Sequence, residues 1–428
     1  MVVNTNNNLV QNTTHKVVIP FYVYAGLSFL AATVLLFLSD NAFTQHYFQP
    51  RTLAITHTMA LGWGTMIILG ASHQLVPVLI EAKLFSNALA YAAFVLAAIG
   101  IPLLVYSFFQ FQFNGIAQAG AILINAAVVC FVLNLAASIL KSKNKNVHAV
   151  FVFTASVWLL ATTVIGLLLV FNFTKNILPK DSVRYLSLHA HIGLVGWFLL
   201  LVMGVGSRLI PMFLISKYDD AKTLWLIYFL VNGALISFIV LFFSAVDSVF
   251  YTVPLTAVSL ALLLFANYCR EAYKYRIRKQ VDEQVKISLL SVAMMLLPVI
   301  FLVAMIALLL FSFANTKLVL AYGFSVFFGW LTAIILGMTF KTLPFIVWNK
   351  VYHNKAGLGK TPNPKDLFSE SLFQKMGLAY LAGFGLFTAG ILLGNTIVLQ
   401  IASVLLFVTA ALYNVNILKM LRHKPLIK

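Results

Sequence analysis

Residues 191–213 read HIGLVGWFLLLVMGVGSRLIPMF, an apolar run long enough to cross a bilayer as a helix. Two other segments align with it without a gap, HTMALGWGTMIILGASHQLVPVL at 57–79 and FSVFFGWLTAIILGMTFKTLPFI at 324–346. The offsets are 134 and 133 residues, and a Gly-Trp pair, a later glycine and a proline recur at matching positions. Self-similarity at a fixed period indicates tandem structural units. We therefore expect three of them, at about 17–140, 148–270 and 285–420.

The composition places the chain in the membrane. Of its 428 residues 61% are hydrophobic and only 9% are charged, whereas soluble domains are about 25% charged. Lipid offers no partner to an unpaired backbone amide, so apolar runs of this length are expected to be helices. The sequence predicts one all-α integral membrane domain, 1–428, with three tandem four-helix units. Its twelve expected spans are 17–39, 52–80, 85–108, 117–140, 148–172, 185–215, 222–245, 248–270, 285–312, 318–348, 375–394 and 397–420.

The basic residues predict the orientation of these helices. The net charge is +18, but only five of the 29 Lys and Arg side chains fall in the connections that follow helices 1, 5 and 9. The other twenty-four lie in the opposite set of connections, at the helix ends beside them or in the two tails. By the positive-inside rule this opposite set is cytoplasmic, including 141–147, 269–286 and 349–374, and so are both termini. We expect a multi-pass protein of the bacterial inner membrane. The charge is explained by this topology and by lipid headgroups, and we do not expect nucleic-acid binding.

The repeated helices carry glycines and polar groups at matching places. Gly70, Gly204 and Gly337 are small residues of the kind that let membrane helices approach closely, and we expect them to serve packing. Farther along, one residue after His73, the aligned positions carry Gln74, Arg208 and Lys341. Two interpretations remain open for these positions: a polar ring at the cytoplasmic mouth, or side chains that snorkel from the helix ends.

Three histidines share one depth near the extracytoplasmic ends of the first two repeated helices. They are His57, His189 and His191, and His57 aligns with His191. Each could simply hydrogen-bond a neighbouring helix, but ionisable groups inside a membrane are costly and mark functional sites. At about 100° per residue, His189 and His191 face opposite sides of their helix. They are therefore unable to clamp one metal ion together, and two separate partners are expected.

These segments resemble helices of haem-copper oxidase subunit I. HAHIGLVGWFLLLVMGVGSRLIPMF is similar to the helix of that family that carries a His-x-His pair, and THTMALGWGTMIILGASHQLVPVL is similar to its second helix. The resemblance implies twelve helices in three arcs with pseudo-threefold symmetry, as in short oxidase-like and NnrS-like membrane haem proteins. It also implies that His57 and His191 are the two axial iron ligands of a low-spin haem b.

The same resemblance implies roles for three more residues. His189 would face a second site, so that the chain holds one haem b or two. Arg51 and Arg184 precede His57 and His189 on the extracytoplasmic side, where they would pair with haem propionates or be ordinary surface arginines.

The sequence departs from the family pattern in two respects. The His-x-His pair lies in the second unit rather than the third, where Tyr322 and Phe324 occupy the matching positions. The further histidines of a copper site are missing, so copper is not expected. All eleven acidic residues fall in loops or at helix ends, whereas proton pumps use buried carboxylates. Oxygen reduction and proton pumping by an oxidase-type enzyme are therefore not expected.

We expect a membrane haem protein that serves in electron transfer in a respiratory chain, or in handling or sensing a diatomic gas such as nitric oxide or oxygen. Its partners would be the lipid bilayer and respiratory or cytochrome subunits. The alternatives are a transporter or channel with threefold tandem repeats, or a non-catalytic subunit of a respiratory complex. Against transport, the tandem four-helix units keep one membrane orientation, whereas many transporters use inverted repeats.

Overall fold

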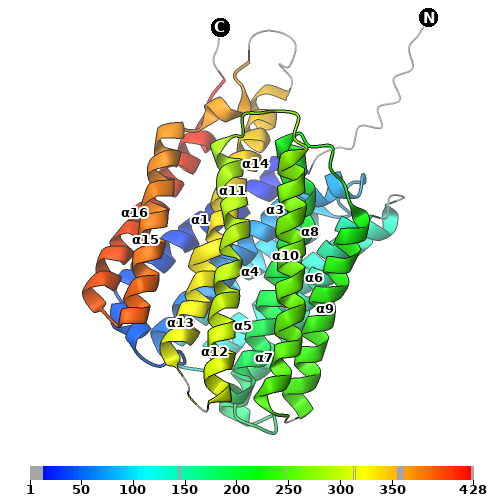
Figure 1. Ribbon diagram of the computed structural model, residues 1–428. Coiled ribbons are helices and arrows are strands. Elements are labelled where there is room, and N and C mark those ends of the chain that lie inside the picture. Colours follow the sequence, from blue (N-terminus) through cyan, green and yellow to red (C-terminus); the bar gives the residue numbers. More distant parts are fainter. Residues whose placement is uncertain are drawn as a thin grey trace, which may run out of the picture.

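The computed structural model describes residues 13–142, 146–244, 246–311, 313, 315–353 and 361–425, and the described residues contain helices and no strand (Figure 1). Parts of the expected loops 141–147 and 349–374 lie outside these ranges. The helices in chain order are α1 (His15–Phe37), η1 (Asp40–Thr44), α2 (Pro50–His57), η2 (Thr58–Thr65), α3 (Met66–Leu79), α4 (Asn87–Phe109), α5 (Gly115–Lys141), α6 (Val147–Lys175), η3 (Ser182–Tyr185), α7 (Leu186–His191), η4 (Ile192–Leu199), α8 (Leu200–Leu214), α9 (Ala221–Ser244), η5 (Ser248–Tyr251), α10 (Thr252–Lys274), α11 (Glu283–Met294), α12 (Leu296–Leu310), α13 (Thr316–Phe324), η6 (Ser325–Leu331), α14 (Thr332–Tyr352), η8 (Pro364–Leu367), α15 (Glu370–Leu393) and α16 (Thr396–Leu421).

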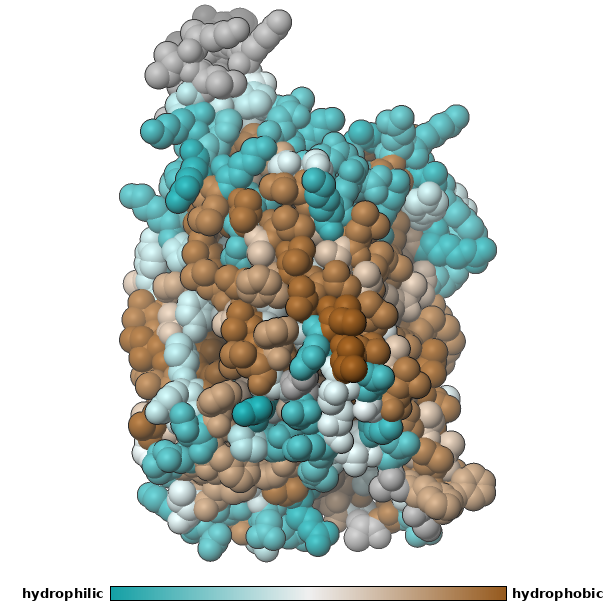
Figure 2. All heavy atoms as spheres, turned by 90° about the vertical axis from the view of Figure 1, so that its left-hand side faces the viewer, coloured by the Kyte–Doolittle hydropathy of each residue, from teal (hydrophilic) through white to brown (hydrophobic). Residues whose placement is uncertain are grey.

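These elements make up the helices of a multi-pass membrane protein. Within the described residues, 12 continuous helical stretches are long and apolar enough to span a bilayer. They agree with the expected spans to within a few residues, and the largest difference is at α15, which begins at Glu370 rather than at 375. Hydrophobic residues gather across the middle of the face in Figure 2, with hydrophilic residues toward both ends.

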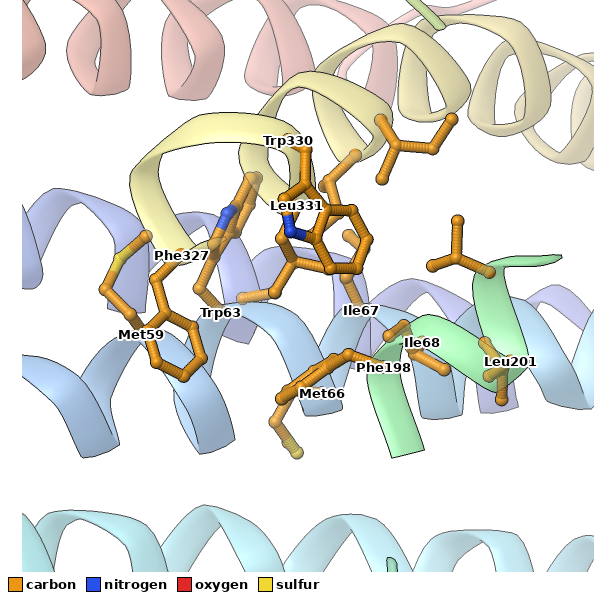
Figure 3. Packing of buried hydrophobic residues seen from close by; sticks show 14 of the residues in the cluster. Met59, Trp63, Met66, Ile67, Ile68, Phe198, Leu201, Phe327, Trp330 and Leu331 are labelled. Atoms are coloured by element: carbon orange, nitrogen blue, oxygen red, sulfur yellow. The ribbon is translucent and has the colours of Figure 1, made fainter. Parts of the chain in front are cut away.

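The three helices that carry the repeated segment form the centre of the bundle. We call them the motif helices: Pro50–Leu79, Ser182–Leu214 and Thr316–Tyr352. In their most apolar stretches 78%, 72% and 83% of residues are buried, against 22% to 50% in the other nine. Figure 3 shows Trp63, Phe198 and Trp330, one from each motif helix, among the buried side chains that pack there. The other helices therefore surround a three-helix core.

The repeated glycines bring the motif helices against their neighbours, as expected. A Cβ atom on Gly204 would lie 2.3 Å from the Cβ of Phe151 in α6. On Gly70 and Gly337 it would lie 2.5 Å and 2.4 Å from side-chain atoms in α1 and α11. No side chain larger than hydrogen fits at these distances, so the prediction of a packing role is confirmed.

Each motif helix is widened to a π-helix at the same point of the repeat. The π-helical segments η2, η4 and η6 follow directly after His57, His191 and Phe324. Such segments are rare and are found frequently at functional sites. Two tryptophans of the repeat tie the motif helices together: Trp63 donates its indole N–H to Thr332 at 3.1 Å, and Trp197 donates to Thr65 at 3.1 Å.

The opposite ends of the motif helices carry the polar positions of the repeat. Lys341 in α14 donates a charged hydrogen bond to Asp282, which precedes α11 and lies 3.5 Å from Arg278. Partial burial raises the pKa of Asp282, but the hydrogen bond and charge of Lys341, aided by Arg278, outweigh it and hold that pKa below its usual value. Asp282 and Lys341 thus join the loop before α11 to the core.

This ion pair predicts a pH-dependent contribution to stability. Because the pKa of Asp282 is lower in the folded state, the contribution is present above about pH 4 and is lost as the pH falls through the folded pKa. We expect Asp282→Asn to lower the free energy of unfolding by about 1 kcal/mol at pH 7. Thermal unfolding in detergent at several pH values checks this. A melting difference from the wild type that persists unchanged at pH 3 would contradict it.

Candidate cofactor site

A single cavity of about 790 Å³ surrounds the α7 and η4 segment of the second motif helix. On one side its walls come from α2, α4, α5 and α6, and on the other from α9, α10, α12 and α13. We call these parts the His57 compartment and the His191 compartment. Small-molecule sites have volumes of about 300–1,000 Å³, so the cavity has the size of such a site. All three of the predicted histidines line it.

Two of the histidines face each other in the His57 compartment. The imidazole rings of His57 and His189 lie with their centres 6.3 Å apart and their planes within 16° of parallel. His57 ends α2 and His189 lies in α7, so the pair joins two motif helices. With their centres this far apart the rings are not in direct contact, and both residues line the cavity.

Hydrogen bonds fix the orientation of both rings. The Nδ1 of His57 lies 2.8 Å from the carbonyl oxygen of Leu53, and the Nδ1 of His189 lies 3.1 Å from that of Thr162. A carbonyl oxygen only accepts, so each Nδ1 carries the proton and donates it. Each Nε2 is then left with a free lone pair, as in metal-bound histidines, whose second ring nitrogen is held by a carbonyl or carboxylate.

Packing also holds the two rings in place. His57 contacts Phe108 of α4, with ring centres 4.6 Å apart. His189 lies against Gly166 of α6, where a Cβ atom would approach its Cε1 to 3.0 Å. The glycine at this position therefore leaves room for the imidazole of His189 beside α6.

The spacing of the rings fits one metal atom between them. If both Nε2 atoms point at one metal from opposite sides, two metal–nitrogen bonds of about 2.0–2.1 Å, with about 1.1 Å from each Nε2 to its ring centre, give a separation of roughly 6.3 Å. The described residues contain no group of three or more His, Cys, Asp or Glu side chains that could hold an ion by themselves. A planar macrocycle brings four nitrogen ligands of its own, so two axial histidines suffice for it. The residues present thus fit a haem better than a bare ion.

His191 lies on the other side of the same helix, in the His191 compartment. Its Nδ1 donates to the carbonyl oxygen of Ser187 at 2.8 Å. Its ring centre is 4.8 Å from Phe238 of α9 and 5.9 Å from Tyr322 of α13, and its plane lies within 20° of that of Tyr322. The opposed directions expected from the His-x-His spacing are therefore present.

The imidazole beside His57 is not that of His191, with which the family resemblance pairs it. The ring of His57 has the imidazole of His189 as a neighbour. The ring of His191 lies instead beside Phe238 and Tyr322. Alignment of repeats identifies positions of equal depth, but it does not determine which side of α7 faces α2. That side depends on the order in which the helices pack, and here it presents the first histidine of the pair.

The two arginines occupy different positions relative to the cavity. Arg184, in η3, lines it, and its charge is available to an anionic group at that end. Arg51 is exposed and lies within 3.4 Å of the carbonyl oxygen of Leu38, and it is not part of the lining. Of the two arginines, Arg184 is therefore the one whose charge is available to a ligand in the cavity.

His73 lies in α3, and its ring contacts are with Phe21 and Phe131 rather than with the three cavity histidines. It is 2% exposed and neither ring nitrogen has a hydrogen-bond partner among the described residues. His73 is not part of the cavity lining.

Several residues of the site carry no sequence signal of their own. Thr162 contributes a backbone carbonyl and Gly166 contributes only space, so neither residue type indicates a site. In the sequence Tyr322 stands out only because it replaces histidine at its place in the repeat. Its position in the cavity wall opposite His191 follows from the packing of α13.

Comparison with known proteins assigns no function to this site. No protein-family model matches the chain, and no curated protein matches it at a significant level. The function is therefore inferred from the cavity and from the histidines that line it.

Proposed function

We propose that this chain is a membrane haem protein that holds one haem b between His57 and His189 and transfers electrons. The observation that carries the proposal is the pair of near-parallel imidazoles 6.3 Å apart, both with Nδ1 held by a backbone carbonyl. A haem bound there supplies a one-electron redox centre.

The residues of the chain would prepare this site in three ways. The carbonyls of Leu53 and Thr162 keep His57 and His189 in the tautomer whose Nε2 binds a metal. The apolar walls of the cavity exclude water from the macrocycle and support its flat faces. Arg184 at the rim offers a positive charge to a propionate.

The arrangement favours electron transfer over binding of a diatomic gas. His57 and His189 would hold such a haem from both sides, which would leave no position at its iron for nitric oxide or oxygen. Gas binding would first require one imidazole to leave, and both rings are held by a hydrogen bond and by packing. Electron transfer requires no change of ligand.

We also propose kinship with the haem-copper oxidase subunit I superfamily and an arrangement of three tandem units about a pseudo-threefold axis. Two observations support this. Trp63 of the first unit donates to Thr332 of the third, and Trp197 of the second donates to Thr65 of the first, so the bonds run in one sense round the motif helices. The three π-helical segments also follow the repeat register. The bacterial inner membrane, with both termini cytoplasmic, belongs to the same proposal.

The proposal predicts a haem protein with a six-coordinate spectrum. The chain would be expressed with a supply of haem, purified in detergent, and assayed for haem per chain and for its oxidised and reduced absorption. We expect one haem b per chain and a reduced spectrum that carbon monoxide does not change. Folded protein that carries no haem, or a reduced haem that binds carbon monoxide at once, would contradict the proposal.

A further inference from the structure

We propose that the His191 compartment binds the ring of a lipid-soluble quinone, held by His191 and Tyr322 and entered from the bilayer beside α12. The proposed function would make this ligand a redox partner of the haem at His57 and His189. The binding site itself is inferred from different residues and does not require the haem to be present.

An unpartnered hydroxyl group points to a ligand in this compartment. Tyr322 is only 9% exposed, yet its hydroxyl makes no hydrogen bond to any described residue. Buried tyrosines usually place their hydroxyl against a partner. The hydroxyl oxygen of Tyr322 is not among the completely buried side-chain atoms that lack a partner, so it is accessible. The residue lines the cavity. Its partner is therefore expected to come from the cavity.

His191 supplies a second hydrogen-bonding group on the same wall. Its Nδ1 is taken by the carbonyl of Ser187, so its Nε2 lone pair is free toward the cavity. The rings of His191 and Tyr322 lie nearly parallel, with centres 5.9 Å apart. A flat ring with two oxygen atoms matches this pair. One oxygen would accept from the hydroxyl of Tyr322, and the other, when the ring is reduced, would donate to the Nε2 of His191. Quinones and quinols have that chemistry.

The remaining walls are suited to a lipid-soluble molecule. From α12 the lining includes Leu302, Met305 and Leu309. Leu309 is also 48% exposed on the outside of the bundle, next to Leu310, which is 51% exposed. The cavity thus reaches the apolar outer surface at this point, where a lipid tail can remain in the bilayer while the ring enters.

The volume of the cavity favours a quinone over a second haem. The two compartments together have about 790 Å³, which is within the range of about 300–1,000 Å³ for a single small-molecule site. One macrocycle and one smaller ring fill such a space more readily than two macrocycles. Phe238, 4.8 Å from His191, also narrows the approach to that imidazole.

Binding of tritiated decylubiquinol, the reduced form whose hydroxyl group can donate to the Nε2 of His191, to the purified chain in lipid nanodiscs tests this inference. We expect saturable binding by the wild type, weakened threefold to tenfold by Tyr322→Phe, which removes one hydrogen bond. His191→Phe should weaken it at least tenfold. Tyr185→Phe is the matched control, because Tyr185 lies near this helix but outside the cavity lining, and it should change binding less than twofold.

The outcomes separate this inference from the proposed function. Absence of saturable binding, or equal binding by all four proteins, would overturn the quinone site. Two haems per chain in the wild type and one in His191→Phe would overturn it as well, because the compartment would then hold a second haem. Only variants whose melting temperature and haem content match those of the wild type are used in the comparison. If protein without haem still binds the quinol in a Tyr322-dependent way, only the proposed function fails.

Discussion

Replacing His57 or His189 with phenylalanine is expected to abolish the six-coordinate haem spectrum, whereas His191→Phe is expected to retain it. Each of the first two substitutions removes one imidazole of the neighbouring pair, with its free Nε2, and leaves a ring in its place. Even residues that merely orient a metal ligand cost about 10–100-fold in affinity when changed. Loss of a ligand should therefore lower the haem content at least tenfold, as measured by haem and protein assay of the purified chain.

The three substitutions control for one another, because all place the same residue at one depth of the same cavity. Yield and melting temperature report whether each variant folds. If His191→Phe loses the spectrum and His189→Phe keeps it, the haem is held by the aligned histidines of the repeat. The pairing proposed from the ring positions would then be wrong.

A large loss of stability is expected from Gly204→Ala, which adds a single methyl group where α8 packs against α6. Gly204→Ala places a Cβ atom 2.3 Å from the Cβ of Phe151, which is fixed to the backbone of α6 and has no room to move away. The helices α6 and α8 must then separate. Overpacking of this kind costs about 1–3 kcal/mol or more, so we expect a clear drop in melting temperature and a poor yield.

Gly233→Ala is the matched control for this substitution. Gly233 lies inside the span α9, and a Cβ atom added there meets nothing within 4 Å. Alanine favours a helix over glycine by about 0.8–1.0 kcal/mol, so this variant should be as stable as the wild type or more stable. Equal melting temperatures for the two variants would contradict the packing role of Gly204.

The helices and their close contacts could be predicted from the sequence because they depend on local properties. Hydropathy locates the spans, and the recurrence of Gly70, Gly204 and Gly337 marks the places where the motif helices meet their neighbours. The depth of the histidines follows from their distance to the helix ends. Each of these properties can be judged one segment at a time.

The partners of the histidines could not be predicted in this way. Whether His189 or His191 faces His57 depends on which neighbour lies on which side of α7, and this is a property of the assembled bundle. Thr162 acts through its backbone and Gly166 through its lack of a side chain, so no residue type announces either role. The cavity itself arises only when α9, α10 and α12 close around the second motif helix.

Near-infrared magnetic circular dichroism of the oxidised protein tests the central claim most directly, because it identifies the axial ligands of a low-spin haem. The geometry of His57 and His189 predicts the signal of two neutral imidazoles, with one haem per chain. A high-spin signal, a different ligand pair, or folded protein without haem would contradict it.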